Sequence, residues 1–153
     1  SAGFDLDMPV EEVRRGVEVQ REYRDASGKA VTQAELGGEL EVRYRVRALG
    51  DKTVPHAAFV DLIPGGFEPV LDSLPRYGPD YDGPEDLDWR PEYVDAREDR
   101  VVLFGSVGPE LQEFSYRIKA VNRGTFALPP TFAESMYDRS VQAQGLGGTM
   151  TVR

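Results

Sequence analysis

The chain contains no cysteine, one histidine and one tryptophan. Without cysteine these residues can form no disulfide, thiol nucleophile or cysteine-ligated metal site. Any serine–histidine–aspartate scheme would depend on His56, and no nucleophile-elbow pattern surrounds it. A zinc site with one histidine would need several carboxylates, which is not the usual ligand set. We therefore predict a non-enzymatic chain with no catalytic residue, cofactor or metal, and interpret His56 as a polar residue at the start of a strand.

Positive charge is also scarce. The sequence has 18 lysines and arginines against 27 acidic residues, a net charge of −9. Nucleic acid and anionic membranes would both repel such a chain. No apolar run approaches the roughly 18 residues of a membrane-spanning helix. We predict no nucleic-acid partner and no direct membrane contact.

The residues that are present favour one all-β domain. The chain has 153 residues, 40% of them hydrophobic, with 16 glycines and 11 prolines. This length suits a single domain, and the many turn-forming residues argue against long helices. We expect residues 1–12 to be a linker segment and residues 13–153 to form the domain.

Strict alternation of apolar and polar residues over Glu39–Ala48 is the clearest strand signal. A second alternation begins at Val17, and a nearly continuous apolar run over Ala57–Ile63, interrupted by Asp61, predicts a central strand. Residues 100–107 and 112–121 are predicted to pair with each other, with a hairpin turn at 122–124 and a last strand at 148–153. The pattern predicts an antiparallel two-sheet β-sandwich of about seven to nine strands.

Residues 67–99 carry most of the charge, with eleven acidic residues and three arginines. This stretch also contains Trp89, and we predict a long acidic insertion loop that Trp89 anchors to the sandwich. The run Asp80–Asp88 has the oxygen-rich composition that calcium prefers, but its spacing does not fit an EF-hand loop. A solvated acidic loop is the favoured interpretation, and a carboxylate pair for glycoside cleavage is a remote alternative.

The segment Pro129–Ser140, PPTFAESMYDRS, places Met136 and Tyr137 between a proline pair and charged residues. Prolines are confined to strand margins, so this segment is predicted to be a shaped loop or strand end. Met136 and Tyr137 are then either ordinary packing residues or an exposed plug for a partner surface. The pattern alone does not choose between these two interpretations.

Five segments together resemble the C-terminal macroglobulin-like domain of bacterial α2-macroglobulins. They follow one another in order over nearly the whole chain: VDLIPGGFEPV (60–70), YVDAREDRVVLFG (93–105), EFSYRIKAVNRGTFALPP (113–130), ESMYDRSVQA (134–143) and the terminal GGTMTV.

The resemblance implies a β-sandwich at the end of a large periplasmic protease trap. It does not decide whether the parent polypeptide is a lipoprotein anchored in the inner membrane. In that family an attacking protease cuts a bait region, and a thioester on a neighbouring helical domain then couples to the protease. The C-terminal domain covers the thioester until cleavage. The family's locking tyrosine falls on Tyr137, with Met136 as its apolar neighbour. The implied partners are the thioester-bearing domain of the same polypeptide and, through the whole molecule, target proteases.

A different class of function stays open at this stage. Similar strand-and-turn segments occur in immunoglobulin-like modules of bacterial surface proteins. The alternative function is therefore a surface or adhesion module whose acidic insertion binds calcium or a partner.

Overall fold

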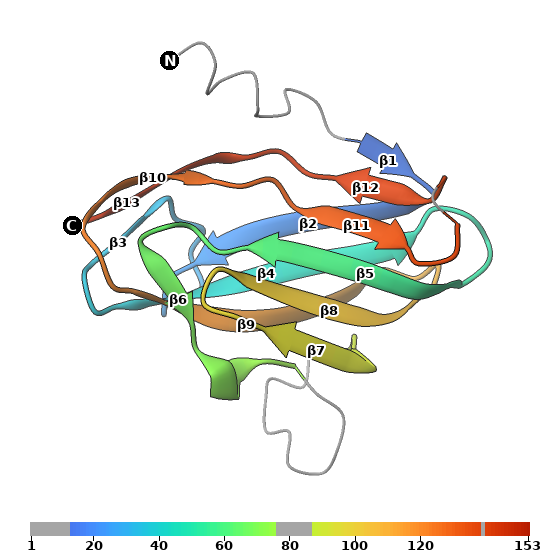
Figure 1. Ribbon diagram of the computed structural model, residues 1–153, viewed down its shortest axis with the longest axis horizontal. Helices are drawn as coiled ribbons and strands as arrows, with labels where there is room; N and C mark the ends of the chain where they lie inside the picture. The colour runs from blue at the N-terminus through green and yellow to red at the C-terminus, as the bar shows by residue number, and fades with distance from the viewer. Residues whose placement is uncertain (1–12, 76–86, 139) are drawn as a thin grey trace.

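The computed structural model describes residues 13–75, 87–138 and 140–153 (Figure 1). Within these ranges the regular structure is β-strand apart from one 3₁₀ turn, Leu71–Ser73, and there is no α-helix. No described helix is therefore long and apolar enough to cross a membrane. The all-β prediction is confirmed, while the linker predicted at 1–12 lies outside the described residues.

Two antiparallel sheets form the sandwich. The six-stranded sheet has the order β1 (Val13–Arg15), β12 (Gln142–Gln144), β11 (Phe132–Ser135), β5 (Val54–Leu62), β8 (Arg100–Val107) and β7 (Tyr93–Ala96). The four-stranded sheet has the order β2 (Val17–Arg24), β4 (Glu39–Ala48), β9 (Gln112–Ala120) and β6 (Phe67–Pro69). A further sheet contains β10 (Gly124–Leu128), β13 (Gly148–Val152) and β3 (Gln33–Ala34), with β3 parallel to β13. The predicted two-sheet sandwich is confirmed, with more strands than expected because several are only two to four residues long.

Two predicted pairings are wrong. Strands β8 and β9 belong to different sheets, because β8 pairs with β5 and β7 while β9 pairs with β4 and β6. The carbonyl of Gly108, just after β8, accepts the N–H of Ala48 at the end of β4, so the chain crosses between sheets there. Likewise, Asn122–Gly124 is not a hairpin turn, since β10 pairs with β13. The N–H groups of Val121 and Asn122 both donate to Gly66 instead.

The ends of the predicted insertion belong to the sandwich. Strand β6 pairs with β9, and β7 pairs with β8. Trp89 is buried, donates from Nε1 to the carbonyl of Ser106 at 2.9 Å, and packs edge-on against Phe59. The predicted tryptophan anchor is confirmed. Residues 76–86, which include most of the calcium candidate Asp80–Asp88, lie outside the described residues, and the described residues contain no metal-binding cluster.

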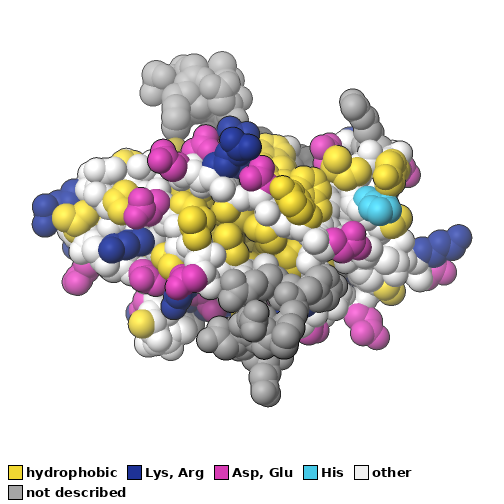
Figure 2. Space-filling view, turned by 60° about the horizontal axis from the view of Figure 1, so that its bottom comes forward, with side chains coloured by type: hydrophobic (Ala, Val, Ile, Leu, Met, Phe, Trp, Pro, Cys, Tyr) yellow, Lys and Arg dark blue, Asp and Glu magenta, His cyan; other side chains and the backbone are white. Residues whose placement is uncertain are grey.

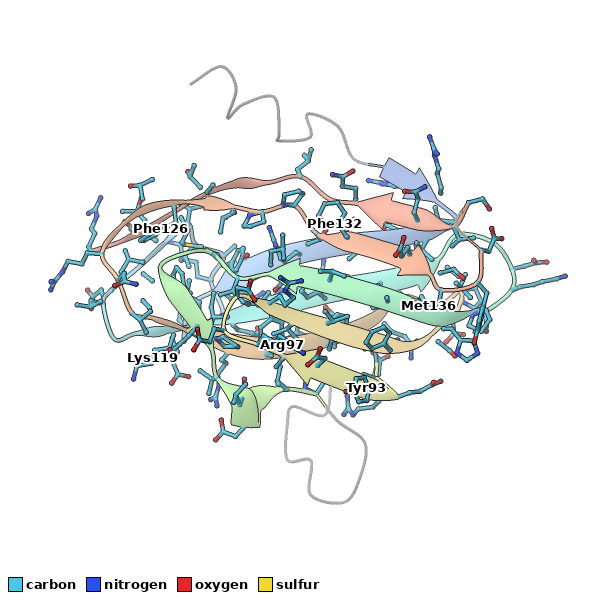
Figure 3. All side chains as sticks on the ribbon, in the orientation of Figure 1. Tyr93, Arg97, Lys119, Phe126, Phe132 and Met136 are labelled. Carbon is cyan, nitrogen blue, oxygen red and sulfur yellow. The ribbon has the colours of Figure 1, made fainter. Side chains whose placement is uncertain are left out.

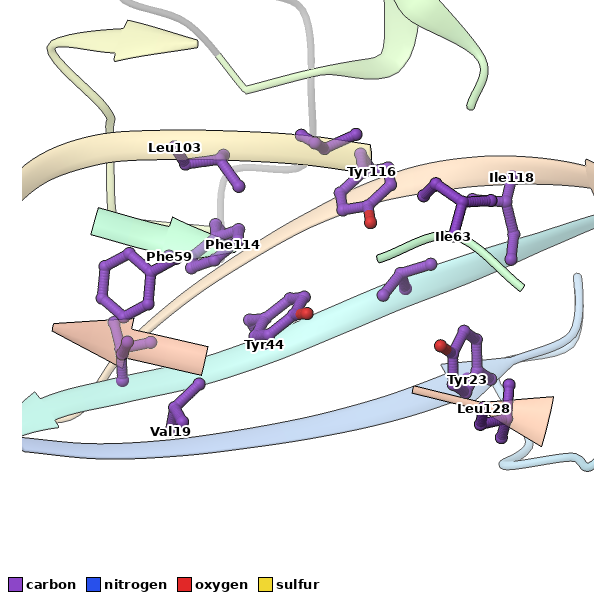
Figure 4. Packing of buried hydrophobic residues seen from close by; sticks show 14 of the residues in the cluster. Val19, Tyr23, Tyr44, Phe59, Ile63, Leu103, Phe114, Tyr116, Ile118 and Leu128 are labelled. Carbon is purple, nitrogen blue, oxygen red and sulfur yellow. The ribbon is translucent and has the colours of Figure 1, made fainter. Parts of the chain in front are cut away.

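The core lies between the inner faces of the two sheets (Figure 4). Every apolar residue predicted to point inward from Glu39–Ala48 is buried, as the alternation requires. The rings of Tyr44 and Phe114 stack at 4.8 Å between centroids. Because these side chains all come from the domain itself, we expect it to fold on its own.

A buried polar cluster joins the two sheets inside this core. Arg21 of β2 donates to Asp61 of β5 at 2.9 Å, and their side chains are only 5% and 2% exposed. The Tyr116 hydroxyl donates to the other carboxylate oxygen of Asp61. Burial raises the pKa of Asp61, and the Arg21 charge opposes that shift. Arg21 also donates to the carbonyl of Pro129 at 2.7 Å, so the cluster fixes the chain just before β11.

Candidate interdomain contact site

The loop between β11 and β12 projects two apolar side chains from the sandwich. Met136 is 53% exposed and Tyr137 is 79% exposed, although both follow directly after the buried Ser135. Neither side chain is therefore a core residue of this domain. Figure 3 shows Met136 at the end of the β11 ribbon, beyond Phe132.

Hydrogen bonds along the backbone hold this loop in shape. The N–H of Ser135 donates to Val141, and the N–H of Val141 donates to Asp138, each at 3.0 Å. The Ser135 hydroxyl accepts the N–H groups of Tyr137 and Asp138 at 3.3 and 3.2 Å. These bonds fix the described part of the loop while the side chains of Met136 and Tyr137 stay exposed.

The Asp138 carboxylate closes the far side of the turn. Its Oδ1 atom accepts the hydroxyl of Ser140 at 2.6 Å and the N–H of Ser140 at 3.0 Å. These two bonds, the hydroxyl first, hold the pKa of Asp138 below its usual value. The carboxylate is therefore ionised at neutral pH, and its bonds to Ser140 persist there.

His56 supports the loop from the neighbouring strand β5. Its carbonyl accepts the N–H of Met136 at 2.9 Å, and its ring meets the Tyr137 ring edge-on with 4.8 Å between centroids. His56 adopts a left-handed backbone conformation, φ 52°, at an irregularity in the register between β5 and β8. Such a conformation is uncommon for a residue other than glycine.

Sequence reasoning missed this role of His56. It expected a polar residue at a strand start, and the residue does lie exposed near the start of β5. The local pattern does not indicate a contact with a residue 81 positions further on. Pro55, which cannot donate to a sheet hydrogen bond, was the one local signal for an irregularity.

The fold and the projecting loop define a β-sandwich domain that exposes Met136 and Tyr137 outside its own core. The family model described as the bacterial α2-macroglobulin MG10 domain matches residues 16–139. The chain therefore belongs to the bacterial α2-macroglobulin MG10 domain family. The matched range includes Met136 and Tyr137.

Curated relatives agree with this family and are much longer. The chain is 40% identical over 95% of its length to an α2-macroglobulin homologue of Yersinia pestis, and 32% identical over 99% of its length to an α2-macroglobulin of Rickettsia conorii. In both comparisons the chain spans 8% of the relative's length.

Solved structures show the same fold. Native α2-macroglobulin from Escherichia coli, spanning the region from domain MG7 to the C-terminus, matches with a TM-score of 0.81 and 25% identity, over 95% of this chain and 24% of that chain. Salmonella α2-macroglobulin reacted with methylamine matches with a TM-score of 0.78 and 26% identity, over 95% of this chain and 10% of that chain.

Proposed function

We propose that this domain shields a thioester on a neighbouring domain of the same polypeptide, as part of a periplasmic α2-macroglobulin-like protease inhibitor. The exposure of the Tyr137 ring, 79%, carries the proposal, because a ring held outside its own core is available to cover another surface. Family membership supports it. The chain has no cysteine, so the thioester would belong to another part of the polypeptide.

The physical task of such a shield is to keep water and amines away from the thioester carbonyl. A flat aromatic ring excludes solvent over a wide area, while its hydroxyl remains able to hydrogen-bond at the rim. Met136 supplies a flexible apolar side chain that adapts to an irregular surface. The domain performs no chemistry in this scheme and needs no cofactor.

The shield must also release when the bait region is cut. Met136 and Tyr137 contact strand β5 through one backbone hydrogen bond and one ring edge, both at His56, which leaves most of their side-chain surface available to a partner. A contact of two side chains is small enough to break during a domain rearrangement. A Salmonella relative has been solved after reaction with methylamine, so methylamine is a suitable reagent for testing the shield.

Replacing Tyr137 by glycine in the intact protein tests the proposal. The expected result is that methylamine consumes the thioester about tenfold faster or more before any protease is added, since the carbonyl becomes accessible. The release of the cysteine thiol measures this rate.

Leu36→Gly provides a matched control, because Leu36 is also an exposed apolar residue but precedes β4 in the four-stranded sheet. We expect Leu36→Gly to react at the wild-type rate. Equal rates for wild type, Leu36→Gly and Tyr137→Gly would remove the shielding role.

A further inference from the structure

The outer face of the six-stranded sheet is apolar at positions where a solvated sheet would carry polar residues. Figure 2 shows hydrophobic side chains gathered at the centre of the face turned toward the reader, with the histidine at its edge. Tyr93 is 62% exposed and Phe132 is 38% exposed, and the side chains between them are half-buried. We call the outward-facing residues Tyr93, Phe104, Val102, Val60 and Phe132 the apolar face.

Strand register makes the apolar face continuous over four adjacent strands. One cross-strand row runs from Phe132 through Val60 and Val102 and ends at Asp95 on β7. The next row begins at Glu134 and runs through Ala58 and Phe104 to Tyr93, and the ring centroids of Phe104 and Tyr93 lie 5.8 Å apart. Neighbours in such rows are in direct side-chain reach.

The opposite side of the sandwich has the usual polar character. Outward positions of the four-stranded sheet carry ion pairs, with Arg45 donating to Glu113 at 2.9 Å and Arg47 to Glu18 at 3.1 Å. The outer face of the four-stranded sheet thus carries ion pairs, whereas the centre of the other outer face is apolar, with Asp95 and Glu134 at its ends. An antiparallel sheet with one face in water normally alternates, and a contiguous exposed apolar face marks an interaction surface.

The apolar face and the Tyr137 loop lie on the same side of β11. Ala133 and Ser135 are buried, whereas Phe132 and Glu134 point outward, and Met136 continues the outward series. The labelled side chains of Phe132, Met136 and Tyr93 span the visible sheet in Figure 3. A partner domain bound to the apolar face would therefore also contact the Tyr137 loop.

We propose that the apolar face is the docking surface, or seat, for the same thioester-bearing domain that Tyr137 covers. This inference rests on the proposed function. A stable interface buries about 800 Å² per partner, far more than the side chains of Met136 and Tyr137 supply. The chain is 8% of the length of its curated relatives, so most of such a polypeptide lies outside it and is tethered nearby at high effective concentration. The matching surface should be apolar, with a basic residue opposite Glu134.

A lysine at the centre of the apolar face tests this seat. In the intact protein, Val102→Lys should raise the rate at which methylamine consumes the thioester by about tenfold, because docking of the partner would bury the lysine charge, and Asp95 opposite it already pairs with Arg97 at 3.6 Å. The matched control is Val121→Lys, the same change at an exposed valine following β9 in the other sheet, and it should leave the rate unchanged. Thermal unfolding of the isolated domain checks that both variants fold.

The outcomes separate the seat from the loop. If Tyr137→Gly accelerates thioester loss and Val102→Lys matches Val121→Lys, the seat is wrong and the loop proposal stands. If Val102→Lys accelerates the loss and Tyr137→Gly does not, the seat stands without the loop. If neither variant accelerates it, both proposals fail. A dimer of the isolated domain that Val102→Lys dissociates would instead assign the apolar face to a second copy of this chain.

Discussion

Two tyrosines of this domain occupy opposite environments. Tyr116 is buried, and its hydroxyl completes the polar cluster with Asp61 and Arg21 between the two sheets. Tyr137 stands on a loop with its ring in solvent against the edge of His56. The comparison separates two uses of one residue type, since the Tyr116 hydroxyl has its partners within this domain, whereas most of the Tyr137 ring is exposed, as the proposed contact requires.

Removal of the buried carboxylate should give the largest effect on the domain itself. Asp61→Ala leaves the Arg21 charge unpaired in the core, which should lower the free energy of unfolding by about 3–5 kcal/mol. Tyr137→Gly should change it by about 0.5 kcal/mol or less, as expected for a surface position. Equilibrium urea unfolding of the isolated domain measures both.

Asp95→Ala is the matched control for the buried ion pair. Asp95 lies 3.6 Å from Arg97 in a pair whose side chains are 42% and 70% exposed. Because solvent screens this exposed pair, Asp95→Ala should lower the free energy of unfolding by only about 0–1 kcal/mol. A loss for Asp61→Ala no larger than for Asp95→Ala would contradict the role given to the polar cluster.

Removal of a single hydroxyl sharpens the comparison between the tyrosines. Tyr116→Phe takes one donor from the buried Asp61 carboxylate and should cost about 1–3 kcal/mol, because that oxygen loses its partner without gaining water. Tyr137→Phe should leave urea unfolding unchanged. If the two changes had equal effects, the buried hydroxyl would not be the stabilising group.

Replacing His56 by glycine should change the stability of the domain and the position of the Tyr137 ring in different ways. Glycine adopts the left-handed conformation freely, so His56→Gly should raise the free energy of unfolding by about 0.5 kcal/mol. The Tyr137 ring loses its aromatic neighbour, and its NMR resonances should move toward those of a freely rotating tyrosine. His56→Phe should keep the wild-type ring environment. A Tyr137 spectrum unaffected by His56→Gly would show that the ring contact does not hold the loop.

The smallest expected effect concerns the charged outer face of the four-stranded sheet. The Arg43 guanidinium, which donates to Glu113, holds the pKa of that carboxyl below its usual value, with Arg45 adding to the effect. A lowered folded-state pKa contributes stability above the unfolded value, and this contribution is lost as pH falls through the folded value. The free energy of unfolding should therefore fall less between pH 7 and pH 3 for Glu113→Gln than for wild type, by about 0.5 kcal/mol or less. An identical decrease in both proteins would contradict the stabilising pairing of Glu113 with Arg43 and Arg45.

The sequence predicted those elements whose signal is local. Strand β4 has the predicted bounds because ten residues alternate without interruption. Asp61 was visible as an interruption in an apolar run, but its partner Arg21 lies 40 positions away, and only the packing of the two sheets brings them together. The crossing between β8 and β9 was missed because a short turn-forming segment serves a hairpin and a sheet crossing equally well.

The contact site was predicted through resemblance rather than through physics. Alternation and composition left Met136 and Tyr137 open between packing and exposure, because a strand end accommodates either. The exposure of both side chains, their support from His56 and the apolar face beside them depend on tertiary structure. A local pattern carries no signal for these features.

The most direct measurement is photocrosslinking from the loop tip in the intact protein. With p-benzoylphenylalanine in place of Tyr137, irradiation of the uncleaved protein should join position 137 to a peptide beside the thioester cysteine, and this product should disappear once the bait region is cut. Crosslinks confined to this domain, or a thioester-domain crosslink unchanged by cleavage, would contradict the account.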